Sequence, residues 1–330
     1  MRKKNIAIIA GGDSGEYVIS VKSAGMIREN LDKNLFVAHR VLIAKQKWMY
    51  VDDDGNEHLI DKNDFSVLLD SGRLYFDCAL ITIHGTPGED GLLQAYFELI
   101  GIPYTTAGVL ASSLTFNKYY CNLVVSKLGF PVPRATMLKK GEPYSEVVIV
   151  EDLGIPVFVK PNEGGSSLGM TFVHEPSELG AAIELAFDHD DTILVEEYLE
   201  GVELTCGVFK HNNKIKPLPV TEIISKTKAQ YFDFEAKYTP GAADEITPAL
   251  IDAALTQKVK DDSAHLYKAL DLDGLVRFDF IYCRDTLYFI EVNITPGMTE
   301  TSLVPQAAAV EGISNTELFT MLIEEALRKC

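Results

Sequence analysis

The hydrophobic positions of the chain follow two different periods, which indicates a protein built from both strands and helices. Residues 6–10 form a short apolar run that predicts a strand, and a glycine-rich turn and a helical pattern ending near Leu31 follow it. Further strands are predicted over 35–43 and 78–83, and a helix over 92–100. A strand, a glycine turn and a helix in succession are typical of an α/β unit.

The second half of the chain repeats this alternation. A strand is predicted to end at Lys160, and a helix over 176–187 follows. Strands are then predicted over 204–210 and 218–225, and a long helix over 248–270. The pattern therefore predicts an α/β protein, with α+β character in its second half.

Two apolar runs late in the chain flank the polar residues 284–286, which predicts a β-hairpin with a three-residue loop. A turn centred in this loop places Asp279 opposite Glu291 and Arg277 opposite Asn293. Cβ atoms of such pairs lie roughly 4.5 to 5.5 Å apart. The hairpin is the stretch around which the rest of the chain is expected to be arranged.

Strand alternation puts Glu291 and Asn293 on the same face as Leu287 and Phe289. Two facing carboxylates on an apolar hairpin repel each other unless a cation lies between them. Carboxylate and amide oxygens suit Mg2+ or Mn2+. The alternative is a pair of solvated carboxylates beside Arg277, which the apolar neighbours disfavour.

Length and composition set the limits of the fold. At 330 residues the chain is longer than one core usually organises, and 47% apolar with 24% charged residues is typical of a folded protein. No apolar run reaches the ~18 residues of a membrane span, and the first residues lack a signal peptide pattern. We therefore expect a cytoplasmic protein without a membrane partner.

Charge and cysteine content exclude further classes. The formal net charge of −18 argues against a nucleic-acid partner, because binding to phosphate backbones needs a basic surface. The cysteines are odd in number and widely spaced, so reduced thiols are expected in place of a disulfide frame or a zinc site. They are Cys78, Cys121, Cys206, Cys283 and Cys330.

Three further stretches carry candidate chemistry. Residues 84–91 follow a predicted strand and read His-Gly-Thr-Pro-Gly-Glu-Asp-Gly, where a His alone would be read as structural. Residues 164–169 hold three glycines and two serines, which could fold over phosphates or form a plain flexible hairpin loop. A helix expected after residue 115 carries Asn117 and Lys118, and Lys118 alone would be an ordinary solvated lysine.

The hairpin and these stretches together resemble a known family. Arg277-x-Asp279, then Glu291-x-Asn293 before Pro-Gly-Met-Thr and Ser-Leu, is similar to the metal and phosphate signature of the ATP-grasp superfamily, specifically of D-alanine-D-alanine ligases. The stretch at 84–91, the glycine loop and a Tyr-Phe-Asp-Phe-Glu-Ala-Lys-Tyr segment resemble the same family. The resemblance spans nearly the whole chain, with five motifs in order.

The resemblance implies a three-domain ATP-grasp architecture with the nucleotide between the central and C-terminal domains. The expected domains are an N-terminal α/β domain over 1–115, a central subdomain over 116–198 and a C-terminal domain over 199–330. Residues 226–243 form a long connection of the kind that usually acts as a lid, and in the family this segment closes over ATP. A homodimer is usual in the family.

The implied reaction joins two D-alanine molecules with ATP and with Mg2+ or Mn2+, two ions being expected, for peptidoglycan precursor synthesis. One D-alanine carboxylate attacks the γ-phosphate to give an acyl phosphate, and the amine of the second D-alanine displaces phosphate. Alternatives are an ATP-grasp enzyme joining another acid and amine, a depsipeptide ligase making D-alanyl-D-lactate, and a nucleotide-binding sensor without catalysis.

The resemblance also assigns the residues around the substrates. Glu16 binds the ammonium of the first D-alanine, supported by Ser166 and His84. Tyr238 is linked through Ser166 to Glu16. The oxyanion is held, and the second carboxylate bound, by groups near the hairpin: Arg277, the backbone N–H of Gly297, Ser302 and the Leu303 amide.

The nucleotide and metal ligands complete the expected site. The relatives usually read Glu-Gly-Ser-Ser in the glycine loop, whereas here a second glycine separates Glu163 from the serines, so Glu163 is left out of the site. The nucleotide is expected to contact Lys118, Lys160, Ser167, Glu196, Glu197, Glu203 and Lys237. The metal ligands are expected to be Asp279, Glu291 and Asn293.

Overall fold

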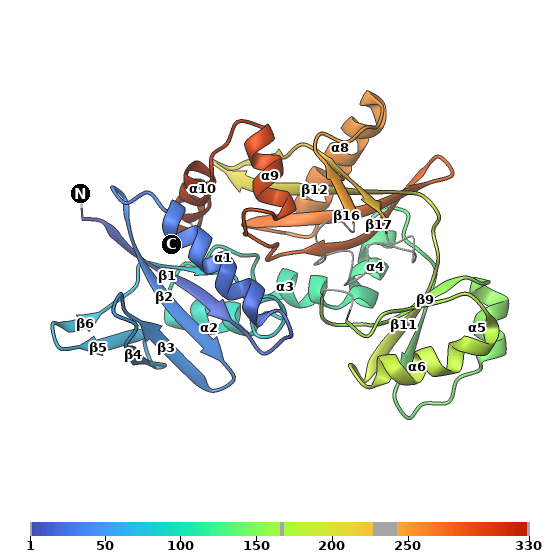
Figure 1. Ribbon diagram of the computed structural model, residues 1–330, viewed down its shortest axis with the longest axis horizontal. Coiled ribbons are helices and arrows are strands. Elements are labelled where there is room, and N and C mark those ends of the chain that lie inside the picture. The colour runs from blue at the N-terminus through green and yellow to red at the C-terminus, as the bar shows by residue number, and fades with distance from the viewer. Residues whose placement is uncertain (1, 166–167, 227–242, 329–330) are drawn as a thin grey trace.

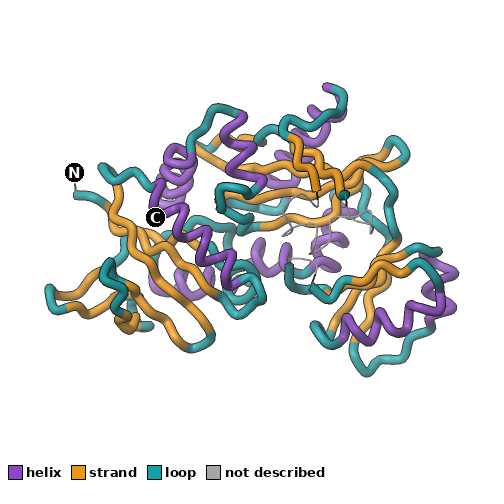
Figure 2. Tube along the Cα trace, viewed as in Figure 1, coloured by secondary structure: helices purple, strands orange, loops and turns teal. Residues whose placement is uncertain are grey.

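The computed structural model describes residues 2–165, 168–226 and 243–328, and it contains three β-sheets (Figures 1 and 2). The first sheet has the order β6-β5-β4-β3-β2-β1-β7. Its strands are β1 (Lys4–Gly11), β2 (Phe36–Ala44), β3 (Lys47–Val51), β4 (Glu57–Asp61), β5 (Ser66–Leu69), β6 (Gly72–Leu74) and β7 (Cys78–Ile81). Helices α1 (Tyr17–Asn30) and α2 (Leu92–Ile100) accompany it.

The predicted strands at 6–10, 35–43 and 78–83 are confirmed as β1, β2 and β7, which are parallel, as is the helix at 92–100. The antiparallel strands β3 to β6 were not predicted. They extend the parallel strands sideways and appear at the lower left of Figure 1. The shortest of them, β6, is exposed along most of its length and so carries no apolar run.

The second sheet is the smallest and has the order β10-β9-β11-β8. Its strands are β8 (Ala135–Lys139), β9 (Val157–Pro161), β10 (Thr171–Val173) and β11 (Thr192–Glu197). Helices α5 (Glu146–Leu153) and α6 (Leu179–Phe187) share its apolar core. The predicted helix at 176–187 begins as a 3-10 turn, η1 (Pro176–Glu178), whose first residue is proline.

The third sheet carries the hairpin and has the order β15-β14-β12-β16-β17, with β13 paired to β12. Its strands are β12 (Val202–His211), β13 (Lys214–Pro217), β14 (Thr221–Ser225), β15 (Ala243–Ile246), β16 (Leu275–Cys283) and β17 (Thr286–Asn293). Helices α8 (Ala253–Ala269), α9 (Leu303–Val310) and α10 (Asn315–Leu327) complete this part of the chain. Helix α8 is shorter than predicted, because Asp252 accepts a hydrogen bond from Leu255 N–H and caps it there.

The helix predicted after residue 115 is α4 (Lys118–Lys127), and a separate helix that was not predicted, α3 (Val109–Phe116), precedes it. Asn117 lies between them in an extended conformation, with φ −89° and ψ 101°. Its Oδ1 accepts a hydrogen bond from the Tyr120 N–H at 3.1 Å, which caps α4. Asparagine favours this position because its side chain satisfies an N–H that the helix cannot.

The hairpin has a two-residue loop, not the predicted three-residue loop. Cys283 pairs with Thr286, and the loop residues Arg284 and Asp285 have φ values of 49° and 59°. Both residues therefore adopt the left-handed conformation of a type I′ turn, whose twist matches that of the flanking strands.

A β-bulge restores the predicted pairing at the site end of the hairpin. Phe280 pairs with Phe289 and Asp279 with Glu291, so β17 carries one extra residue, Ile290, between them. The bulge also reverses the predicted side-chain faces: Leu287 and Phe289 lie in the core with Val292, and Glu291 lies on the other face. The prediction that Glu291 shares a face with Leu287 and Phe289 was wrong, because alternation fails across a bulge.

The first and third sheets share one core. Ile27 of α1 and Ile8 of β1 belong to the same apolar cluster as Phe319 and Ile323 of α10. The C-terminal helices therefore hold the first sheet against β12 of the third sheet (Figure 1). In the part of the chain that the structure describes, no helix is long and apolar enough to cross a membrane. The described cysteines are all buried, and no disulfide joins them to one another: Cys78, Cys121, Cys206 and Cys283.

The turn of the hairpin gives a stability prediction. Replacing Arg284 by Asn and Asp285 by Gly should raise the melting temperature, because the left-handed conformation costs most residues about 1 kcal/mol, whereas Asn and Gly adopt it at a smaller cost. The gain exceeds the loss of the exposed hydrogen bond from the Tyr282 hydroxyl to Asp285. Scanning calorimetry of the double variant measures it. A lower melting temperature than wild type would contradict the turn geometry.

Candidate active site

The main pocket lies between the second and third sheets. Its apolar wall includes Phe158 of β9 and Phe280 of β16, with Tyr198 just beyond the end of β11. Its polar wall gathers almost all of the predicted nucleotide and hairpin residues that the structure describes. They are Lys118, Lys160, Glu196, Glu197, Glu203, Arg277, Asp279 and Glu291. An apolar slot with convergent polar groups is typical of a small-molecule site.

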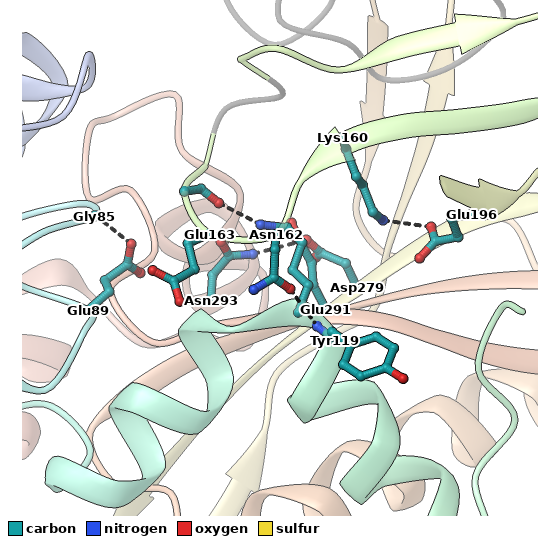
Figure 3. A network of polar contacts seen from close by, with 12 residues as sticks. Gly85, Glu89, Tyr119, Lys160, Asn162, Glu163, Glu196, Asp279, Glu291 and Asn293 are labelled. Carbon is teal, nitrogen blue, oxygen red and sulfur yellow. Dashed lines mark hydrogen bonds and ion pairs between the residues drawn. The ribbon is translucent and has the colours of Figure 1, made fainter. Parts of the chain in front are cut away.

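Lys160 and Glu196 form a buried ion pair at the pocket wall. The Lys160 Nζ donates to Glu196 Oε1 at 2.6 Å, and the two residues lie on the neighbouring antiparallel strands β9 and β11 (Figure 3). Glu196 is 4% exposed, and its other oxygen, Oε2, has no hydrogen-bond partner among the described residues. A buried acceptor without a donor is costly, so this oxygen is suited to a ligand donor.

Glu197 makes a different contact. Its carboxylate accepts from the Arg134 backbone N–H at 2.8 Å and from the Arg134 Nε at 2.9 Å. The side-chain hydrogen bond to Glu197 and the charge of that carboxylate raise the pKa of Arg134 above its ordinary value. The Glu197 side chain is thus held towards Arg134, and its predicted nucleotide role stays a prediction.

The hairpin brings Arg277, Asp279, Glu291 and Asn293 together as predicted. The Arg277 guanidinium donates two hydrogen bonds to the Asp279 carboxylate, at 2.8 and 2.7 Å. The Asn293 side-chain amide donates a third to Asp279 at 3.1 Å. Burial lowers the pKa of Arg277, but the Asp279 carboxylate outweighs burial and raises it, so Arg277 stays charged. Figure 3 shows Asp279, Glu291 and Asn293 next to one another.

The carboxylates of the hairpin already have protein cations beside them. Arg277 pairs with Asp279, and the Lys118 Nζ lies 4.0 Å from Glu291 Oε2. The expectation that their repulsion demands a metal ion was therefore wrong as an electrostatic argument. The prediction of a metal site therefore rests on the kind of oxygen ligands that Asp279, Glu291 and Asn293 offer, and on the resemblance stated above.

A second, smaller pocket adjoins the first and shares Lys118 and Glu291 with it. Glu16 and His84, predicted to meet the first substrate, line this pocket. The glycine loop reaches it as well, since a Cβ atom added to Gly165 would lie 2.8 Å from the Glu16 carboxylate. The structure thus brings residues near both ends of the chain to one small polar cavity.

Glu89 is a residue of this small pocket to which the sequence assigned no role. Its carboxylate accepts from the Gly85 N–H at 2.7 Å and from the Thr295 N–H at 3.2 Å, so it joins the loop after β7 to the loop after β17. Burial raises the pKa of Glu89, nearby Glu16 raises it further, and His84 lowers it. The sequence could have indicated a role for Glu89, because it lies five residues after His84 in the same 84–91 motif.

The predicted oxyanion and second-carboxylate groups lie on the loop between β17 and α9. The Ser302 Oγ accepts from the Thr299 N–H at 2.9 Å and lies 2.8 Å from the Thr299 hydroxyl. A Cβ atom on Gly297 would lie 2.9 Å from Ser302 Oγ, so these two residues are neighbours. Leu303 is the first residue of α9. Neither pocket is lined by these described residues.

Four predicted residues lie outside the described part of the chain. They are Ser166 and Ser167 of the glycine loop, and Lys237 and Tyr238 of the segment 226–243. Their roles stay predictions.

The slot lies between two antiparallel sheets, with Lys160 on β9 and Lys118 on α4 beside it, and solved structures with this arrangement of the chain belong to the ATP-grasp class. The family profiles described as D-ala D-ala ligase N-terminus and C-terminus match residues 5–107 and 124–324. The chain belongs to the D-alanine-D-alanine ligase family. The α/β class and the ATP-grasp fold expected from the sequence are thereby confirmed.

Individual relatives cover the whole chain. A D-alanine--D-alanine ligase of Parabacteroides distasonis is 43% identical over 99% of this chain and 98% of its own length. The VanG D-Ala:D-Ser ligase of Enterococcus faecalis is 32% identical with a TM-score of 0.86, covering 98% of this chain and 100% of that one. The D-alanine--D-alanine ligase of Bacillus anthracis complexed with ATP is 30% identical with a TM-score of 0.80, covering 100% and 98%.

The raised pKa of Glu89 gives a pH-dependent prediction. A raised pKa means that the folded protein disfavours the charged carboxylate, so the stability cost is present at high pH and disappears as pH falls through that pKa. Glu89→Gln removes this charge but also one of the two oxygens that accept from Gly85 and Thr295, so the melting temperature of the variant relative to wild type should be higher at pH 8 than at pH 5. Thermal melts at both values test this. If the melting temperature of the variant relative to wild type were higher at pH 5 than at pH 8, the raised pKa of Glu89 would be contradicted.

Proposed function

We propose that this protein is an ATP-dependent ligase that joins two D-alanine molecules into D-alanyl-D-alanine for peptidoglycan precursor synthesis. The proposal rests on one observation: a large slot suited to a nucleotide adjoins a small polar pocket. Both cavities are lined by Lys118 and Glu291. A substrate carboxylate in the small pocket would then meet the terminal phosphate of a nucleotide in the large one. Family membership supplies the reaction.

The first step brings two anions together. A D-alanine whose ammonium is held by Glu16 would present its carboxylate to the γ-phosphate, and an O–P bond forms as the bond to the departing ADP breaks. Lys118, Lys160 and Arg277 border this region and would offset the negative charge. Cations held in place before the reaction stabilise the transition state without being reorganised.

The second step forms the peptide bond. The deprotonated amine of the second D-alanine attacks the acyl phosphate carbon, the C–O bond to phosphate breaks, and inorganic phosphate leaves with the charge. Arg277, with the backbone N–H of Gly297, would hold the oxyanion of the tetrahedral intermediate. Ser302 and the Leu303 N–H would bind the carboxylate of the second substrate, because the first N–H groups of a helix lack partners within it.

The nucleotide base is proposed to lie against Phe158 in the apolar half of the slot. The Oε2 of Glu196 is a buried acceptor, which is suited to the exocyclic amine of adenine. Glu203 of β12 lines the same slot and would accept hydrogen bonds from ribose hydroxyls. The backbone of Glu197, next to Glu196, would border the base.

The residues of the hairpin fit a divalent metal ion. Asp279 and Glu291 provide carboxylate oxygens and Asn293 an amide oxygen, and Mg2+ usually binds through one or two carboxylates plus substrate phosphates. Among the described residues no three acidic, His or Cys side chains cluster closely enough to hold an ion alone, in keeping with a site completed by phosphates. When bound, one or two Mg2+ or Mn2+ ions would offset phosphate charge.

We also propose the finer organisation expected from the sequence. The domains would span 1–115, 116–198 and 199–330, each containing one of the three sheets. The enzyme would act as a homodimer, as is usual in the family. It would act in the cytoplasm, where its co-substrate ATP is available.

The identity of the second substrate separates the main proposal from its alternatives. A D-Ala:D-Ser ligase is among the similar solved structures, so D-serine is a second candidate, and D-lactate would give a depsipeptide. Phosphate release with ATP and Mg2+ should be measured with D-alanine alone and with added D-serine, D-lactate or L-alanine, and the products weighed. We expect D-alanyl-D-alanine as the main product. Preferential formation of another product, or none, would overturn the proposal.

The metal assignment gives a mutational prediction. Asp279→Asn and Glu291→Gln should each lower kcat by roughly 100-fold while the protein stays folded, because each removes a ligand charge. Asp261→Asn, on an exposed position of α8, is the matched control and should not change kcat. Turnover is measured against Mg2+ concentration with circular dichroism for folding. Wild-type rates at low millimolar Mg2+ in either hairpin variant would refute the assignment.

A further inference from the structure

Hydrogen bonds join the base of the glycine loop to the first turn of α4. One of their partners, Asn162, has no predicted role in the site. Asn162 follows the last residue of β9, and Lys118 is the first residue of α4. The Tyr119 N–H donates to Asn162 Oδ1 at 2.9 Å, and the Lys118 N–H donates to Asn162 O at 3.2 Å (Figure 3). One asparagine thus satisfies two N–H groups that a helix leaves without partners at its start.

Neighbouring contacts extend this junction on both sides. The Lys118 Nζ donates to the Gly164 carbonyl at 2.6 Å, and the Asn117 amide donates to Glu163 Oε1 at 3.0 Å. Glu163 was left out of the predicted site, and here its side chain binds the residue that caps α4. We call the residues 117–119 and 162–164 the loop junction.

Asn162 is held rigidly within its own sheet. It is 1% exposed, and its N–H donates to the Thr192 carbonyl at 3.0 Å. The next residue is fixed as well, since the Glu163 N–H donates to Asp190 Oδ2 at 2.8 Å. The backbone of Asn162 and of the next residue is therefore fixed by hydrogen bonds. A buried polar side chain on such a fixed backbone can determine the position of the helix that packs against it.

We propose that Asn162 is a positioning residue that sets where Lys118 meets the nucleotide phosphates relative to Lys160. Lys160 lies on β9, two residues before Asn162, whereas Lys118 reaches the pocket from α4. Without the Asn162 side chain the Tyr119 N–H would lose its acceptor, and the first turn of α4 would no longer be fixed to β9. This inference deepens the proposed function, since it rests on Lys118 contacting the nucleotide.

The test compares three single variants of the full-length protein. Asn162→Ala removes the acceptor, Asn162→Asp keeps an acceptor oxygen near the helix N-terminus, and Asn122→Ala is the control. Asn122 is a buried asparagine of the same helix whose Oδ1 has no partner among the described residues. Calorimetry measures the Kd for the ATP analogue AMPPNP with Mg2+, and steady-state kinetics gives KM for ATP and for D-alanine.

Asn162→Ala should raise the Kd for AMPPNP and the KM for ATP roughly ten-fold, with KM for D-alanine within about two-fold of wild type. Asn162→Asp should stay within about three-fold of wild type for the nucleotide, and Asn122→Ala should not change it. Hydrogen exchange of the peptide spanning 117–123 should be faster in Asn162→Ala alone. If that variant does not fold, Asn162→Gln, whose oxygen is displaced by one methylene, should show the same loss.

Three results would overturn the inference: an unchanged nucleotide Kd in Asn162→Ala, an equal loss in Asn162→Asp, or an equal loss in Asn122→Ala. The calorimetric titration needs no D-alanine. A wild-type protein that binds AMPPNP but makes no dipeptide would therefore contradict the proposed function, while the comparison among the variants would still decide the role of Asn162.

Discussion

The site depends on one constraint in the third sheet: two acidic side chains must face the nucleotide slot while the aromatic residues beside them fill the core. A regular hairpin with the observed two-residue turn would not place Asp279 opposite Glu291. The extra residue Ile290 in β17 shifts the register by one and turns Glu291 to the slot, while Phe289 stays buried. Bulges of this kind are common beside active sites, because they redirect a single side chain.

The charges of the slot are arranged in pairs before any ligand binds. Lys160 is paired with Glu196, Arg277 with Asp279, and Lys118 lies near Glu291. In a chain with a formal net charge of −18, these cations would not suffice to attract polyphosphate over a distance, but they act at close range in a partly buried slot. A bound nucleotide phosphate or metal ion would exchange partners with groups that are already ionised and oriented.

The three sheets meet at the small pocket through a few directional contacts. Glu89 joins the loop after β7 to the loop after β17, and the loop junction joins β9 to α4. Helix α10 closes the arrangement by packing Phe319 into the core of the first sheet. Burial raises the pKa of Glu89, although its hydrogen bonds from Gly85 and Thr295 lower it, so the contact between these loops depends on a carboxylate whose charge burial disfavours.

Most helices and strands, the family and most residues of the slot could be predicted from the sequence, because hydrophobic period and short motifs are local properties, whereas β3 to β6 could not. The sequence also predicted the pairing of Asp279 with Glu291, although two errors cancelled: a loop one residue too long and a missed bulge. Tertiary structure alone decided that protein cations neutralise these carboxylates, that Glu89 bridges two loops and that Asn162 fixes α4. Such contacts join residues far apart in the chain, and no local pattern records which distant group will satisfy a given charge or N–H.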